Sequence, residues 1–88
     1  MSAILTNPGY HLVAIDKGQL GELSKIQEEL HEAVDAEAQG VKVMVLAELS
    51  DLVGAVEAYL AKHHPGTTLD DLKKMSDVTH RAFQSGRR

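Results

Sequence analysis

The stretch LAELSDLVGAV, residues 46–56, combines an apolar helical pattern with two acidic side chains. Its large apolar residues recur mostly at steps of three and four, the spacing of one helix face. They are Leu46, Leu49, Val53 and Val56. Alanine and glycine fill much of the remaining circumference, and a helix that is apolar nearly all round is usually buried between several neighbours. The sequence therefore predicts a buried central helix, which Pro65 and Gly66 end.

Helical patterns flank this central helix on both sides. Before it, apolar residues from Leu20 to Val34 keep the same spacing, and Gly40 suits a helix end. After it, Thr68 is predicted as an N-cap, with Asp71 in the position of the capping box. The predicted elements are helices near 20–39, 41–63 and 68–85, after a short extended N-terminal segment.

The length of 88 residues fits one domain with a small core. We predict an all-α fold, a small helical bundle of about three helices. Three helices leave little material to cover the central one, so we expect a second copy to complete the bundle in a homodimer or homotetramer.

Charge and composition exclude several classes of protein. The net charge of −4 disfavours binding to duplex nucleic acid, which needs a basic face. The N-terminus has no basic region, Pro8 and Gly9 interrupt its apolar run, and we predict no signal peptide. No apolar run approaches the roughly 18 residues of a membrane span. The absence of cysteine excludes disulfides and thiolate metal sites, and with it we expect a cytoplasmic protein.

The helix predicted near 20–39 carries an acidic group within KIQEELHEAVD, residues 25–35. At about 100° per residue, Glu28, Glu29 and Glu32 share one flank of this helix, beside its apolar face. Carboxylates this close repel one another, and a solvated surface would screen the repulsion. Taken alone, the group is consistent with an exposed acidic face.

The acidic pair of the central helix is harder to explain in that way. Glu48 and Asp51 are three residues apart, so they are neighbours on a side that also carries alanines. No Lys or Arg occurs between Val43 and Ala61 to compensate their charge. An ionised carboxylate in an apolar setting costs several kcal/mol without compensation. Either this side of the helix faces water, or a metal ion binds the carboxylates.

Fifteen residues separate Glu32 from Glu48, which is enough for one helix to end and the next to return antiparallel. The carboxylates of both helices would then converge across the helix pair. A site of carboxylate oxygens without cysteine suits Mg²⁺ or Mn²⁺.

The order EELHE, fifteen residues, then ELSD resembles the signature of the all-α nucleoside triphosphate pyrophosphohydrolases. That signature has two adjacent Glu, a third Glu three positions on, and Glu-x-x-Asp on the following helix. MazG proteins, dimeric dUTPases and phosphoribosyl-ATP pyrophosphohydrolases belong to this superfamily. The resemblance covers roughly residues 20–60, with Lys25 at the usual lead-in. The tail from Met75 onward is similar to the basic end of short, phage-encoded members.

The resemblance implies a single MazG-like helical domain over residues 1–88. Such a domain hydrolyses a nucleoside triphosphate between the α- and β-phosphates and releases a monophosphate and pyrophosphate. The resemblance assigns Mg²⁺, with Mn²⁺ as a possible substitute, to four carboxylates. They are Glu29, Glu32, Glu48 and Asp51. Glu28 would be a further ligand or the group that activates the attacking water.

A triphosphate also needs cations, and four basic residues are candidates for phosphate binding. They are Lys25, Arg81, Arg87 and Arg88. The alternative for Lys25 is an ion pair with Glu29, worth a few tenths of a kcal/mol. The alternative for the two terminal arginines is a frayed chain end. If they contact phosphate, we expect them to come from a neighbouring subunit.

Two other functions compete with the hydrolase. Glu28 and His31 match one Glu-x-x-His element of a di-iron bundle, but the central helix has Asp51 where a second histidine is needed. The remaining alternative is a non-enzymatic helical-bundle interaction or regulatory protein with a solvated acidic face. Nothing in the sequence indicates which base a nucleotide substrate would carry.

Overall fold

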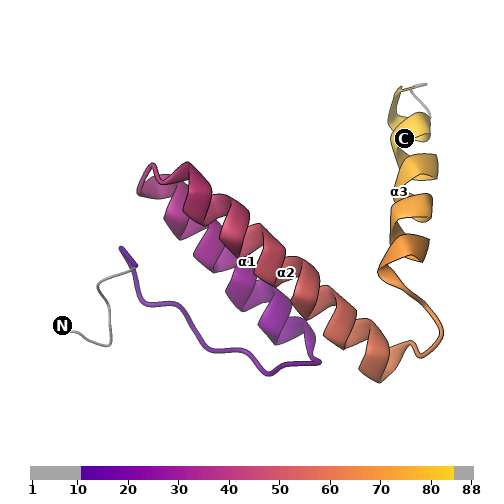
Figure 1. Ribbon diagram of the computed structural model, residues 1–88, viewed down its shortest axis with the longest axis horizontal. Coiled ribbons are helices and arrows are strands. Elements are labelled where there is room, and N and C mark those ends of the chain that lie inside the picture. The colour runs from indigo at the N-terminus through magenta and orange to yellow at the C-terminus, as the bar shows by residue number, and fades with distance from the viewer. Residues whose placement is uncertain (1–10, 85–88) are drawn as a thin grey trace.

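The computed structural model describes residues 11–84, with side chains as far as His80. This part of the chain contains three helices, α1 (Leu23–Ala38), α2 (Lys42–His63) and α3 (Leu69–Gln84), and no strand (Figure 1). The all-α prediction is therefore confirmed, and each predicted helix agrees with the observed one within a few residues. The expected extended segment lies partly outside the described residues, and residues 11–22 form neither helix nor strand.

The predicted helix end at Gly40 is confirmed, and hydrogen bonds explain it. The Gly40 N–H donates to the carbonyl of Glu37 at 2.9 Å, and the Val41 N–H donates to Ala36 at 3.3 Å. This pair of bonds is a Schellman motif, which needs a residue in the left-handed region at its turn. Gly40 supplies that conformation with φ +78°. The chain reverses here, and α2 returns alongside α1.

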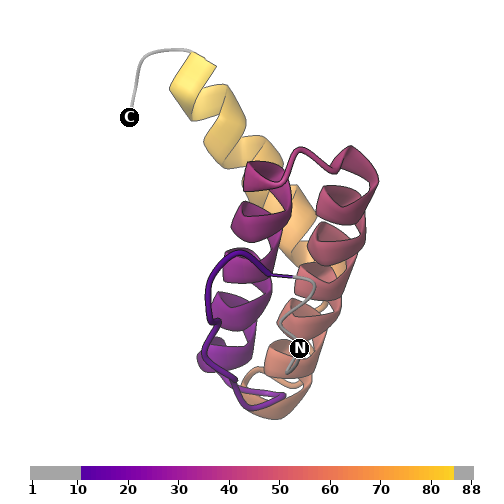
Figure 2. The ribbon, with the colours of Figure 1, turned by 90° about the vertical axis from the view of Figure 1, so that its left-hand side faces the viewer.

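Helices α1 and α2 form an antiparallel hairpin, side by side in both views (Figures 1 and 2). The buried apolar side chains of the hairpin are few, and three of the four are alanines. They are Ala33, Ala36, Ala55 and Leu60. At the open end of the hairpin, Glu22 accepts hydrogen bonds from Lys62 and from His63, the latter at 3.0 Å. These contacts join the start of α1 to the end of α2.

Seven large apolar side chains of the hairpin are exposed, which the apolar pattern of the two helices did not predict for one chain. One is Val43. The other six are Leu23, Leu30, Val34, Leu46, Leu49 and Val53, and we call these six the apolar face. At about 100° per residue, they lie round from the buried alanines by about 110° on α1 and about 150° on α2. Because the helices are antiparallel, this rotation places both sets on the same side of the hairpin. Burial of α2 as predicted therefore requires something outside the single chain.

Helix α3 begins at the predicted capping box. The Asp71 carboxylate accepts the Thr68 N–H at 2.8 Å, and the Asp71 N–H donates to the Thr68 hydroxyl at 3.2 Å. The helix projects away from the hairpin and leaves Met75 and Val78 exposed (Figure 1). No helix within residues 11–84 combines the length and apolar character needed to cross a membrane.

Candidate metal centre

The acidic flank of α1 faces inward, toward α2 and the N-terminal segment. Glu28 and Glu29 are only 4% and 5% exposed, and Glu32 is half-buried. The interpretation of this group as a solvated surface is therefore wrong for the single chain. The hairpin buries carboxylates on this flank, while leucines of the apolar face remain in water.

Carboxylates from both helices converge, as the spacing predicted. Ligand atoms of Glu28, Glu29 and Glu32 lie within 4.8 Å of one another. The same limit holds for Glu29 with Glu48 and Asp51, so Glu29 belongs to both groups. We call these five residues the acidic cluster. The geometric prediction is confirmed for the described residues, whereas metal binding by the acidic cluster stays a prediction.

Lys25 contacts the acidic cluster. Its ammonium lies 3.2 Å from Glu28 Oε1 and 3.1 Å from Glu29 Oε2. The hydrogen bond to Glu29 is the main reason that the pKa of Lys25 is raised. The ion pair that competed with phosphate binding is thus present. One ammonium compensates only part of the charge of five acids, and contact between Lys25 and a phosphate stays a prediction.

The protein without metal lowers this charge by retaining a proton on Glu32. Burial, a hydrogen bond with Glu28 and the neighbouring charges of Glu29 and Glu48 raise the pKa of Glu32 to about 8. Burial and the charge of Asp51 likewise raise the pKa of Glu48. Burial also acts to raise the pKa of Glu28, but the hydrogen bonds that it accepts outweigh this effect and lower it. At neutral pH, Glu32 is therefore protonated beside an ionised Glu28.

The hydrogen bonding of two carboxylate oxygens in the acidic cluster shows whether a cation would fit there. Glu29 Oε1 and Glu48 Oε1 are buried and accept no hydrogen bond from the described residues. Buried polar atoms are nearly always hydrogen-bonded, and exceptions need an explanation. A divalent cation would satisfy both atoms, and the donor set consists of the hard oxygens that Mg²⁺ and Mn²⁺ prefer. The residues present therefore fit such an ion.

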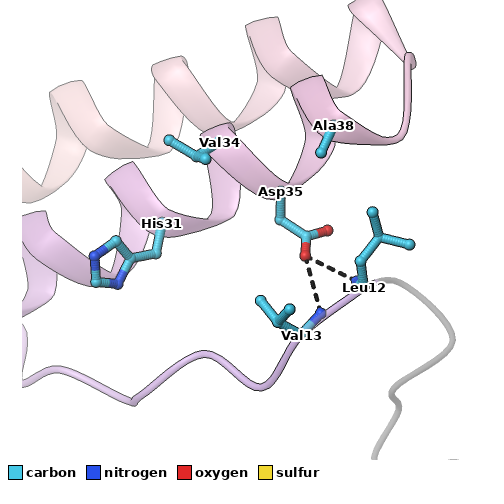
Figure 3. Close-up of a pocket in the computed structure, with 6 residues that line it drawn as sticks. All are labelled: Leu12, Val13, His31, Val34, Asp35 and Ala38. Carbon is cyan, nitrogen blue, oxygen red and sulfur yellow. Dashed lines mark hydrogen bonds between the residues drawn. The ribbon is translucent and has the colours of Figure 1, made fainter.

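A segment that the sequence did not mark as functional lies against the same flank of α1. We call residues 11–18 the strap. The N–H groups of Leu12 and Val13 donate to Asp35 Oδ2 (Figure 3). The Gly18 N–H donates to Glu28 Oε1. Asp35 and Glu28 are seven residues apart in the sequence, a spacing that places both on one side of a helix. That spacing is the signal from which Asp35 could have been identified. No comparable pattern identified Gly18.

An apolar hollow of about 280 Å³ lies beside the strap, between it and α1 (Figure 3). Its lining residues are Leu12, Val13, His31, Val34, Asp35 and Ala38. His31 is exposed, as expected once the di-iron interpretation had failed. The lining is almost wholly apolar, and both oxygens of Asp35 already accept hydrogen bonds. The carboxylates of the acidic cluster are therefore the chemically distinctive groups of this part of the chain.

Of the remaining candidates for phosphate binding, the structure describes only the backbone of Arg81. Arg81 belongs to α3, which lies against α2 but not α1 in the described residues and projects away from the hairpin (Figure 1). Arg87 and Arg88 lie outside the described residues. Their roles stay predictions.

Comparison with known proteins adds no relative. No family model, curated protein or solved structure matches this chain. The assignment of a function therefore depends on the quoted motif and on the geometry of the acidic cluster.

Proposed function

We propose that this protein is a Mg²⁺-dependent nucleoside triphosphate pyrophosphohydrolase of the all-α, MazG-like type. It would cleave a triphosphate between the α- and β-phosphates to give a nucleoside monophosphate and pyrophosphate. One observation carries the proposal. Glu29 lies within 4.8 Å of Glu48 and Asp51 across two helices, and two carboxylate oxygens in this group are buried without a hydrogen-bond partner.

Four carboxylates of the acidic cluster would be metal ligands, and Glu28 would have a separate role. Glu29, Glu32, Glu48 and Asp51 would hold the ion, with Mn²⁺ as a possible substitute for Mg²⁺. A bound divalent cation supplies charge neutralisation for the triphosphate and lowers the pKa of a coordinated water. Glu28 stays ionised at neutral pH, so it would accept the proton of the attacking water or act as a further ligand.

Basic residues would complete the phosphate site. Lys25 already lies at the rim of the acidic cluster, about one turn before Glu29, where a phosphate could replace part of its ion pairing. Arg87 and Arg88 would come from a neighbouring subunit. Arg81 would contact phosphate from α3, which does not contact α1 in the described part of the chain. We further propose a homodimer or homotetramer, in which the apolar face is covered, and a cytoplasmic location, where triphosphates are abundant.

Binding of nucleotide should require the metal, because ionised carboxylates and a triphosphate repel each other. Thermal melts test this requirement with the protein alone, with Mg²⁺, with a triphosphate, and with both. We expect the melting temperature to rise with Mg²⁺ and to rise further with both ligands, since a ligand that binds only the folded state stabilises it. A triphosphate that stabilises the protein equally well in a chelator would contradict the proposal.

Activity is tested by a screen for pyrophosphate release over common and modified triphosphates with Mg²⁺ and Mn²⁺. Glu48→Gln should abolish turnover while the fold stays intact, because it removes a ligand that has no cation to pair with. Glu57→Gln, an exposed residue of the same helix outside the acidic cluster, is the matched control. If Glu48→Gln retains full activity, the site is wrongly assigned.

The alternative is a non-enzymatic helical-bundle interaction or regulatory protein. The observation in its favour is the apolar face, since a contiguous exposed apolar surface marks an interaction site. A protein of this kind would form the same oligomer without responding to Mg²⁺ and triphosphate in the melts. The two functions are therefore separated by the same experiment.

A further inference from the structure

Two carboxylates of α1 bind the backbone of the strap at separate points. Asp35 Oδ2 accepts the N–H of Leu12 at 2.8 Å and that of Val13 at 3.2 Å (Figure 3). Two helical turns earlier, Glu28 Oε1 accepts the Gly18 N–H at 2.8 Å. The strap therefore follows the flank of α1 that carries the acidic cluster, and it contacts the acidic cluster at Glu28.

The position of Gly18 depends on its having no side chain. A Cβ at this residue would overlap the backbone of Ser24 and Lys25 in the first turn of α1. Gly18 does not adopt a left-handed conformation, so the requirement for glycine is steric. Next to it, the Gln19 N–H donates to the Ser24 hydroxyl at 3.1 Å. Close packing against α1 is what brings the Gly18 N–H within reach of Glu28.

Asp35 anchors the other end of the strap and takes no part in the acidic cluster. Its side chain is 2% exposed, and each of its oxygens has a partner besides solvent. Oδ1 accepts a hydrogen bond from Gln39 at 2.5 Å and lies 3.6 Å from His11 Nδ1. Removing a buried carboxylate with this many donors is costly, because each donor would then be left without an acceptor.

The contact with Gly18 has a consequence for Glu28. A backbone N–H in a packed strap is a rigid donor, whereas the Lys25 ammonium is on a flexible side chain that would be drawn toward a phosphate. The Gly18 N–H thus restrains the orientation of the Glu28 carboxylate.

We propose that the strap is a positioning element of the acidic cluster, in which the Gly18 N–H orients the Glu28 carboxylate and Asp35 anchors the strap. The role in turnover rests on the proposed function, whereas the contact itself does not. Misplacing a reacting group by about 1 Å can cost a hundredfold in rate. Loss of the strap should therefore lower kcat and leave substrate binding nearly unchanged.

The test compares Gly18→Ala and Asp35→Asn with the wild type and with Lys17→Ala, a control in the strap whose side chain is exposed. We expect Gly18→Ala to lower kcat about ten- to a hundredfold with KM changed by less than about threefold. Asp35→Asn should lower kcat in the same direction, and Lys17→Ala should leave it unchanged. Circular dichroism establishes folding, and if Gly18→Ala does not fold, Asp35→Asn decides the question.

Amide hydrogen exchange in the metal-free protein gives a readout that is independent of activity. The amides of Leu12, Val13 and Gly18 should be protected in the wild type, and Asp35→Asn should speed their exchange at least about tenfold. A wild-type Gly18 amide that exchanges as in an unfolded peptide would overturn the contact.

The two proposals fail in different ways. A Gly18→Ala variant that folds and keeps the wild-type kcat, in an active enzyme, would overturn the strap alone. A wild-type chain that releases no pyrophosphate from any triphosphate would overturn the proposed function, while exchange at Gly18 would still decide whether the strap holds Glu28.

Discussion

Glu32 is the residue of the acidic cluster that holds a proton at neutral pH. Its pKa in the folded protein is about 8, against an ordinary value of 4.5. A raised pKa means that the folded state holds a proton that the unfolded state releases. The stabilising contribution of Glu32 is therefore complete below about pH 4.5 and is lost as the pH rises through 8. Metal ligands must be deprotonated, so Mg²⁺ binding should displace this proton.

From this linkage we predict that the melting temperature of the metal-free protein and the increase that Mg²⁺ causes change in opposite directions with pH. Between pH 6 and 9 the metal-free melting temperature should fall, while the stabilisation that Mg²⁺ provides should grow. One displaced proton corresponds to about a tenfold gain in Mg²⁺ affinity per pH unit below the pKa. Thermal melts at fixed Mg²⁺ measure both trends. Glu32→Gln should flatten the metal-free trend, and equal Mg²⁺ effects at pH 6 and pH 8.5 would contradict the assignment.

At the scale of the elements, two glycines in comparable open surroundings should respond oppositely to alanine. Neither Gly40 nor Gly54 has an atom within 4 Å of the place that a Cβ would take. Gly40 has φ +78°, which costs an L-residue about 1–2 kcal/mol, whereas Gly54 lies inside α2, where alanine gains about 0.5–1 kcal/mol. We expect Gly40→Ala to lower, and Gly54→Ala to raise, the free energy of unfolding measured in urea. Equal effects would contradict the conformational explanation.

The helices could be predicted because their signals are local. The apolar periodicity and the residues that mark helix termini, such as Gly40 and Thr68, depend on neighbours in the chain. Together they located all three helices. The spacing of three residues likewise predicted that Glu48 and Asp51 are neighbours on one face of their helix. Their convergence with Glu29 required one further assumption, a turn between antiparallel helices, which the Schellman motif at Gly40 provides.

What the sequence did not reveal was which side of each helix packs inward. Periodicity shows that Leu23 and Leu30 share a face and that Glu28 and Glu32 share another, but not which face meets α2. We expected the large apolar residues to be buried in preference to other residues. In the hairpin of a single chain, alanines and carboxylates are buried instead. The contacts of the strap were equally out of reach, because an irregular segment has no period from which Gly18 could be matched to Glu28.

For the whole molecule, this arrangement is understandable if the chain folds with a second copy. Burying a large apolar side chain yields about 1.5–3 kcal/mol, and the apolar face contains six of them. A single core of 88 residues has little stability to spare, so leaving this surface in water is costly. Val34 of the apolar face also lines the hollow beside the strap, so a partner on the apolar face would meet the strap at that edge.

We therefore predict that the apolar face holds the oligomer together. Sedimentation equilibrium should give a mass of two or four times 9.6 kDa, and the melting temperature should rise with protein concentration. Leu46 is 67% exposed in one chain, so Leu46→Lys should leave the monomer fold intact and weaken self-association at least about tenfold. Met75→Lys is the control, because Met75 is 62% exposed but lies on α3, outside the apolar face. A wild-type chain that sediments as a monomer, or a Leu46→Lys variant that associates like Met75→Lys, would show that the apolar face is not the interface.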